Sequence, residues 1–148
     1  MSIELVRTYD GHTNIVVAVC ALNGKQFVSG SNDATLKLWN VGDGDVQNAV
    51  RTYSGHTGLV TAVCKMNDTH FVSGSNDATL KLWNVDKEDA VMTYKGHTGE
   101  WSGRDLFYMR QMERKYPVNA VCKMNDTHFV SGSNDTYLKL WNVDKEDA

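Results

Sequence analysis

Short runs of alternating apolar and polar residues, separated by turn residues, fill most of the chain. The pattern is clearest over residues 60–85, where VTAVC, the turn NDTH, HFVSGS, the turn ND and TLKLWNV follow one another. Alternation and β-branched residues between turn signals predict strands. A further strand is expected in AVMTYKGH, residues 90–97, so the pattern predicts an all-β chain of short strands.

The same pattern occurs three times along the chain. GHTNIVVAVCALNGKQFVSGSNDATLKLWNV begins at Gly11, GHTGLVTAVCKMNDTHFVSGSNDATLKLWNV begins at Gly55, and a third unit begins at Gly96 and ends in VSGSNDTYLKLWNV. LVRTYDGH, AVRTYSGH and AVMTYKGH are expected to supply a fourth strand before each unit. Four strands in about forty residues are typical of a β-propeller blade.

The second and third units are almost identical. Residues 61–90 and 119–148 differ at three of thirty positions, Thr61/Asn119, Ala78/Thr136 and Thr79/Tyr137. Such near-identity indicates a recent duplication or a human design.

The Gly-His pairs and the Leu-Trp-Asn endings resemble the WD40 repeat family, whose usual ending is Leu-Trp-Asp. The resemblance spans residues 1–148 except for one extra stretch, and it implies a single domain of three WD40-type β-propeller blades. In that family a hydrogen-bonded set of His, Ser or Thr, Asp and Trp braces each blade. Carried over by motif, the sets are His12, Ser29, Asp33 and Trp39; His56, Ser73, Asp77 and Trp83; and His97, Ser131, Asp135 and Trp141. Ser31 and its equivalents are the alternative serines.

Three residue types of these sets also form the catalytic triads of hydrolases. Because the set recurs three times, each time with a Trp, we expect buried polar networks that fix strand geometry. No phosphate loop, H-E-x-x-H or C-x-x-C motif is present. We therefore expect no enzyme activity, no cofactor and no metal. Cys20, Cys64 and Cys122 share one repeated position and are expected to be small buried hydrophobes.

Composition agrees with a globular interaction module. The 148 residues are 41% hydrophobic and 22% charged, with a formal charge of −3, which argues against nucleic-acid binding. No apolar run approaches the ~20 residues that span a bilayer, and the first residues do not resemble a signal peptide. We expect a cytoplasmic protein.

Three blades are too few for a closed ring, since propellers typically have about four to eight. The first segment, ELVRTYD, has no three strands before it, and the last three strands end at NVDKEDA without a fourth. Unpaired strand edges are normally satisfied. We therefore expect head-to-tail homo-oligomerisation, in which the first strand of one chain completes the last blade of the next. A homo-trimer with nine blades is favoured over a homo-dimer with six, and an incomplete fragment is the alternative.

The extra stretch interrupts the third unit. His56 and Cys64 are 8 positions apart, whereas His97 and Cys122 are 25 apart, which places a 17-residue insert, EWSGRDLFYMRQMERKY, at residues 100–116. Its helix formers and a capping box at Ser102 and Asp105 predict a helix over residues 103–115. We expect this helix on the top face of the third blade, near the positions at which the third unit differs from the second.

Aromatic and Arg side chains are typical anchors for a protein partner. The residues expected to bind a protein or peptide are Trp101, Arg104, Phe107, Tyr108, Arg110, Met112, Tyr116, Asn119 and Tyr137. The expected function is therefore a non-catalytic scaffold whose insert is a recognition element. In the alternative, the insert is a structural or assembly element that sets ring size and has no external ligand.

Overall fold

The chain folds into short antiparallel strands, and no helix occurs among the residues described by the structure, a computed structural model. It describes residues 2–42, 48–99 and 114–145. Two four-stranded sheets, one three-stranded sheet and a two-stranded ribbon contain all the strands of this part of the chain. The all-β prediction is confirmed.

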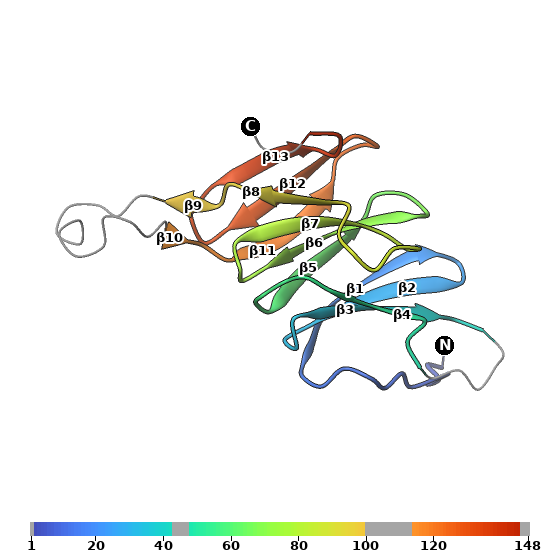
Figure 1. Ribbon diagram of the computed structural model, residues 1–148. Coiled ribbons are helices and arrows are strands. Elements are labelled where there is room, and N and C mark those ends of the chain that lie inside the picture. The colour runs from blue at the N-terminus through green and yellow to red at the C-terminus, as the bar shows by residue number, and fades with distance from the viewer. Residues whose placement is uncertain (1, 43–47, 100–113, 146–148) are drawn as a thin grey trace.

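Each repeat forms its own sheet, with strands that pair in chain order (Figure 1). Sheet one consists of β1 (Val16–Asn23), β2 (Gln26–Ser31), β3 (Thr35–Asn40) and β4 (Arg51–Ser54). Sheet two consists of β5 (Val60–Lys65), β6 (His70–Ser75), β7 (Thr79–Asn84) and β8 (Met92–Lys95). Sheet three consists of β11 (Val118–Lys123), β12 (His128–Ser133) and β13 (Leu138–Asn142).

The Ser-Asn-Asp turn joins the second and third strands of each sheet in the same way. In sheet one the Ala34 amide donates to the Ser31 carbonyl, and Asp33 Oδ1 accepts from the Thr35 amide. The residue after the Asp adopts a left-handed backbone in every repeat, with φ of 68° at Ala34, 68° at Ala78 and 74° at Thr136. The Asp side chain therefore stabilises a turn whose left-handed backbone is unfavourable for the residue that follows the Asp.

The sheets stack side by side in chain order, with their first strands in contact (Figure 1). β1 lies against β5, and β5 lies against β11. Between the sheets lie two apolar clusters, one joining sheets one and two and the other joining sheets two and three. The sheets therefore have the arrangement of successive propeller blades around inner first strands.

The segment before Gly11 differs from the predicted fourth strand. Residues 2–10 pair as a strand with no residue that the structure describes. Tyr9 nevertheless packs edge-on against Phe27 and Trp39, with ring centroids 5.0 and 5.6 Å apart. Tyr53 of β4 packs on Phe71 and Trp83 of sheet two at 5.1 and 5.6 Å. The Tyr9 ring thus makes the contacts of a fourth-strand Tyr, although its own segment pairs with no described strand.

The insert leaves sheet three through a short ribbon. β9 (Thr98–Gly99) pairs with β10 (Arg114–Lys115), and the Tyr116 amide donates to the His97 carbonyl. The helix predicted for residues 103–115 is therefore wrong at residues 114 and 115, because the two ends of the insert pair with each other there. Residues 100–113 lie outside the described residues. No helix long and apolar enough to cross a membrane occurs in the described ranges.

Candidate functional site

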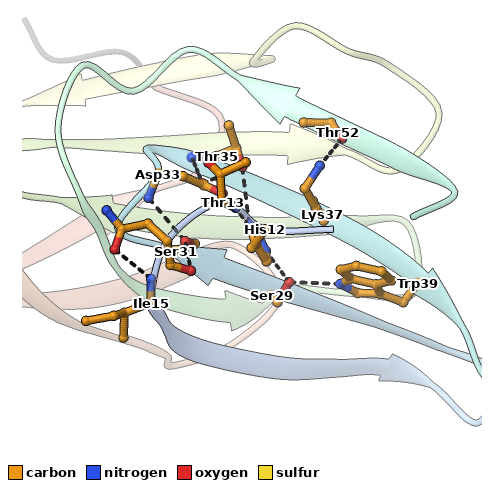
Figure 2. Close-up of polar contacts among 11 residues, drawn as sticks. His12, Thr13, Ile15, Ser29, Ser31, Asp33, Thr35, Lys37, Trp39 and Thr52 are labelled. Carbon is orange, nitrogen blue, oxygen red and sulfur yellow. Dashed lines mark hydrogen bonds and ion pairs between the residues drawn. The ribbon is translucent and has the colours of Figure 1, made fainter. Parts of the chain in front are cut away.

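A chain of four hydrogen-bonded side chains runs through sheet one from the Ser-Asn-Asp turn to the interior (Figure 2). Asp33 Oδ2 lies 2.7 Å from His12 Nδ1, and His12 Nε2 lies 2.7 Å from Ser29 Oγ. Trp39 Nε1 donates to the same Ser29 oxygen at 2.8 Å. The loop before β1 supplies the His, β2 the Ser, the turn the Asp, and β3 the Trp.

The other two sheets repeat this geometry. In sheet two the Asp–His and His–Ser distances are 2.8 and 2.7 Å, and in sheet three they are 2.6 and 2.7 Å. In sheet three His97 precedes the insert and Asp135 follows it, so the bonded pair is 38 residues apart rather than 21. The structure therefore brings together all four residues of each predicted set, and the insert leaves the third set assembled. The residues are His12, Ser29, Asp33, Trp39, His56, Ser73, Asp77, Trp83, His97, Ser131, Asp135 and Trp141.

The direction of these bonds follows from their end groups. A carboxylate only accepts and an indole N–H only donates. His Nδ1 therefore donates to the Asp, and the Ser oxygen accepts from the Trp. With a neutral imidazole, the Ser hydroxyl then donates to His Nε2. Ser73 is fully buried and Ser131 is 1% exposed, so both hydroxyls face the interior of their sheets. The network links the loop before the first strand, the turn and two strands of the same sheet.

Sequence reasoning missed a fifth member of two of these networks. Thr35 Oγ1 and Thr79 Oγ1 each lie 2.6 Å from Oδ1 of the neighbouring Asp. Burial alone would raise the pKa of Asp77, but hydrogen bonds from His56 and Thr79 outweigh it and hold the pKa well below its ordinary value. The signal was available, since Thr follows the turn residue Ala34 or Ala78 in both repeats.

The third sheet has Tyr137 in place of that Thr. The Tyr137 amide still donates to Asp135 Oδ1 at 2.9 Å. The side chain of Tyr137 is 66% exposed, which is unusual for an aromatic residue. Sheet three has thus exchanged a half-buried hydroxyl contact for an exposed aromatic ring.

The predicted recognition residues lie partly at one end of sheet three. We call this the top end; it is formed by the Ser-Asn-Asp turn together with the loop after the Gly-His pair. Asn119 Nδ2 donates to Asn134 Oδ1 there, and the Asn134 amide donates to the Pro117 carbonyl. Tyr137 follows the turn, and Tyr116, at the base of the insert, is half-buried. Trp101, Arg104, Phe107, Tyr108, Arg110 and Met112 lie outside the described residues.

The thiols do not form a metal site in the described ranges, where no group of three or more His, Cys, Asp or Glu side chains is placed to hold an ion. Burial raises the pKa of Cys64, which keeps this thiol protonated near neutral pH. Cys122 is exposed, and Cys20 is half-buried. Cys64, like Cys20, is only half-buried, so the expectation of three buried cysteines is wrong.

Two large apolar surfaces remain open at the outer sheets. On sheet one the exposed residues include Val16 and Val19, and on sheet three they include Met124, Leu138 and Leu140. The corresponding residues of sheet two are buried or half-buried between its two neighbours. Open apolar patches of this kind indicate interaction surfaces.

Three stacked antiparallel sheets, each braced by a His–Ser–Asp–Trp network, define the chain as a segment of a β-propeller. The sequence matches the WD40 family, described as "WD domain, G-beta repeat", at residues 3–40, 47–84 and 110–142. These matches cover more than half of the chain, which therefore belongs to the WD40 repeat family. WD40 domains are generally non-catalytic scaffolds that mediate protein–protein interaction.

The third match has a different start from the other two. It begins at residue 110, within the insert, and so leaves out Gly96 and His97. The structure nevertheless bonds His97 to Asp135 and Ser131. No curated protein matches the chain.

Proposed function

We propose that the chain is a non-catalytic protein-interaction scaffold that assembles head to tail with copies of itself into a closed ring. Three copies would give nine blades and are our first expectation, and two copies would give six. The near-identity of residues 61–90 and 119–148 supports a recent duplication or design of the repeat. The insert and the top end of sheet three form the recognition element of this scaffold.

The observation that carries the ring is a difference in exposure between equivalent residues. Val16 of sheet one is 52% exposed, whereas Val60 and Val118 at the same position are fully buried. The surface around this valine is covered by a preceding sheet in sheets two and three but is exposed in sheet one. This difference supports a contact between sheet one and a sheet of another copy. A heterologous contact of this kind closes into a ring when the rotation between copies permits.

The recognition role is supported by Tyr137. An exposed aromatic ring at the same end of sheet three as the base of the insert is a typical anchor for a protein or peptide. Because it replaces the Thr of the other two sheets, Tyr137 gives up a hydroxyl contact with Asp135. Ring assembly would present two or three copies of this surface and would add avidity to weak single contacts.

Light scattering on the intact chain and on a variant lacking residues 100–116 tests the assembly and the role of the insert. The deletion joins Gly99 to Pro117, which resembles the Gly58-Leu59 junction of the second repeat. We expect both proteins to have the same copy number, which leaves the insert available to a partner. A changed copy number on deletion would make the insert an assembly element and overturn its recognition role.

A matched substitution tests recognition directly. Peptides selected by display against the intact chain should bind at least tenfold more weakly to Tyr137→Thr, which restores the residue of the other repeats. Lys87→Ala, in the exposed turn before β8, is the control and should leave affinity unchanged. Peptides whose affinity is unaffected by both Tyr137→Thr and the insert deletion would contradict the assignment.

A further inference from the structure

The two interfaces within the chain are built from the same positions. We use "forward face" for the side of a sheet that packs on the next sheet, and "rear face" for the side that packs on the previous one. The forward faces comprise Leu22, Val28, Leu36 and Leu38 in sheet one, Met66, Val72, Leu80 and Leu82 in sheet two, and Met124, Val130, Leu138 and Leu140 in sheet three. The rear faces comprise Val16, Phe27 and Trp39; Val60, Phe71 and Trp83; and Val118, Phe129 and Trp141.

The forward face of sheet three is open. Leu138 is 80% exposed and Leu140 is 65% exposed, whereas Leu80 and Leu82 of sheet two are 0% and 6% exposed. Burying a Leu side chain is favourable because it removes apolar surface from water. The sequence of this face is nevertheless the same as that of the buried forward face of sheet two. It therefore retains the side chains of a blade-to-blade contact.

The rear face of sheet one is open in the complementary way. A cavity of about 380 Å³ is lined there by Val16, Val19, Phe27 and Trp39, together with residues of the Tyr9–His12 segment. In sheets two and three the equivalent valines are covered by the forward face of the preceding sheet. The rear face of sheet one is thus the only one of the three that is not covered by a forward face among the described residues.

At each interface within the chain, a glycine of one sheet packs against a valine on the rear face of the next sheet. A Cβ added at Gly30 would meet Val60 Cγ1 at 2.6 Å, and one added at Gly74 would meet Val118 Cγ1 at 2.7 Å. A Cβ added at Gly132 would meet only Leu138 Cδ2, at an ordinary 3.5 Å. Sheet three therefore presents the same recess for a valine, and no valine of the described chain fills it.

The edge of sheet three is open as well. β13 pairs with β12, and no second partner strand exists among the described residues, whereas β3 and β7 each pair with a fourth strand. In those sheets Leu36 lies opposite Tyr53, and Leu80 lies opposite Tyr94. Lys37 and Lys81 each donate to the opposite Thr at 2.8 Å. The segment containing Thr8 and Tyr9 has the same Thr-Tyr sequence, and Tyr9 packs on Phe27 and Trp39 as Tyr53 packs on Phe71 and Trp83 of the next sheet.

We propose that a second copy of this chain occupies both open surfaces at once, with the Val16 side chain of one copy seated over Gly132 of the other. Residues 3–10 of the first copy then form the fourth strand of sheet three in the second copy. The register follows from β3–β4 and β7–β8: Tyr9 lies opposite Leu138, and Thr8 lies opposite Lys139, whose ammonium donates to the Thr hydroxyl. This inference rests on the ring of the proposed function and specifies its interface.

Gly132→Ala tests the recess, because the added methyl group meets no obstacle within one chain. We expect this variant to keep the circular dichroism spectrum and cooperative unfolding of the parent. The concentration of half-assembly should rise tenfold or more, since the methyl group would meet Val16 of the second copy. Gly24→Ala, where an added Cβ meets nothing within 4 Å, is the control and should assemble as the parent does.

A second substitution in the same chain distinguishes loss of the Val16–Gly132 contact from a general weakening of assembly. Val16→Ala removes the methyl groups that would meet the new Cβ. Gly132→Ala combined with Val16→Ala should therefore assemble better than Gly132→Ala alone. Equal or weaker assembly of the double variant would contradict the Val16–Gly132 contact.

Disulfide trapping tests the strand register independently of Gly132. A mixture of Thr8→Cys and Lys139→Cys chains should oxidise to a covalent dimer, because opposite residues in an antiparallel pair have Cα atoms within disulfide range. Val6→Cys mixed with Lys139→Cys is displaced by two residues and should give at least fivefold less dimer. Equal yields from the two mixtures would overturn the register.

Failure of the interface and failure of the ring give different results. An unmodified chain that stays monomeric at all concentrations would overturn the ring and this interface together. An unmodified chain that forms a ring, whose mass is unaffected by Gly132→Ala and whose Thr8–Lys139 pair is not trapped, would overturn the interface alone.

Discussion

At the scale of single residues, the serine at the centre of each network has the largest structural role. Ser73 Oγ joins Trp83 Nε1 at 2.8 Å and His56 Nε2 at 2.7 Å, and all three residues are buried. Removing one partner of a buried polar group leaves the others unsatisfied, which costs more than the bond itself contributes. Removing any one of the four shared side chains is therefore expected to destabilise its sheet.

Ser73→Ala should lower the free energy of unfolding by about 1–3 kcal/mol, since both the indole N–H and the imidazole lose their partner. Denaturant unfolding monitored by Trp fluorescence measures the change. Ser54→Ala, at an exposed position at the end of β4, is the control and should change stability by less than about 0.5 kcal/mol. Equal effects of the two substitutions would contradict the bracing role.

The carboxylate of the network predicts a dependence of stability on pH. The pKa of Asp77 is lower in the folded chain than in the unfolded chain, because hydrogen bonds from His56 and Thr79 outweigh burial. A lowered carboxyl pKa stabilises the fold above the unfolded pKa of about 3.9, and this stabilisation is lost as the pH falls further toward the folded pKa. The free energy of unfolding should therefore decline below about pH 4.

Asp77→Asn isolates that contribution. Urea unfolding of this variant at several pH values should show a smaller decline in acid than the parent shows. Asp89→Asn changes an exposed carboxyl group in the turn before β8 and should retain the parent's pH profile. Parallel profiles for Asp77→Asn and the parent would contradict the assignment of the carboxylate.

At the scale of elements, the hairpin turns show where the repeats differ in backbone strain. Ala34, Ala78 and Thr136 adopt the same left-handed conformation, with φ between 68° and 74°. This conformation costs an L-residue about 1–2 kcal/mol relative to Gly, and the cost is greatest for β-branched side chains. The third repeat therefore has the most strained turn of the three.

Thr136→Gly should raise the free energy of unfolding by about 0.5–1 kcal/mol, because relief of strain exceeds the extra chain entropy of Gly. Ala21→Gly, in an ordinary strand conformation within β1, should instead lower it by about 0.5–1 kcal/mol. Thermal and denaturant unfolding compare the two. A loss of stability at both positions would show that the left-handed turn is not strained.

Local pattern predicts most of the strands of this chain, because each lies between its own turn signals. VTAVC, HFVSGS and TLKLWN were predicted as strands and correspond closely to β5, β6 and β7. The ribbon β9–β10 could not be predicted, since two-residue strands form only because both ends of the insert return to one sheet. The same tertiary requirement makes the helix prediction wrong at residues 114 and 115. The role of Thr79 was missed because its hydroxyl meets Asp77 only in the finished turn, although the sequence repeats this Thr at the same position in two units.

At the scale of the whole molecule, the chain is a stack of three sheets with two equivalent interfaces inside and two unmatched halves outside (Figure 1). The open halves repeat the side chains of the buried ones, and Gly132 repeats the recess at Gly30 and Gly74. An open forward face on sheet three and an open rear face on sheet one are complementary between copies. The two interfaces within the chain therefore show the geometry expected for the head-to-tail contact between copies.

Native mass spectrometry of the unmodified chain over a range of concentrations tests this account most directly. Closed assembly predicts one discrete species that persists as the protein is diluted. Its mass should be three times 16.5 kDa for a trimer, or two times 16.5 kDa for a dimer. A monomer of 16.5 kDa at every concentration would contradict the account, because both apolar faces would then remain in water. A continuous ladder of ever larger species would also contradict it, since the contacts would then form without closing a ring.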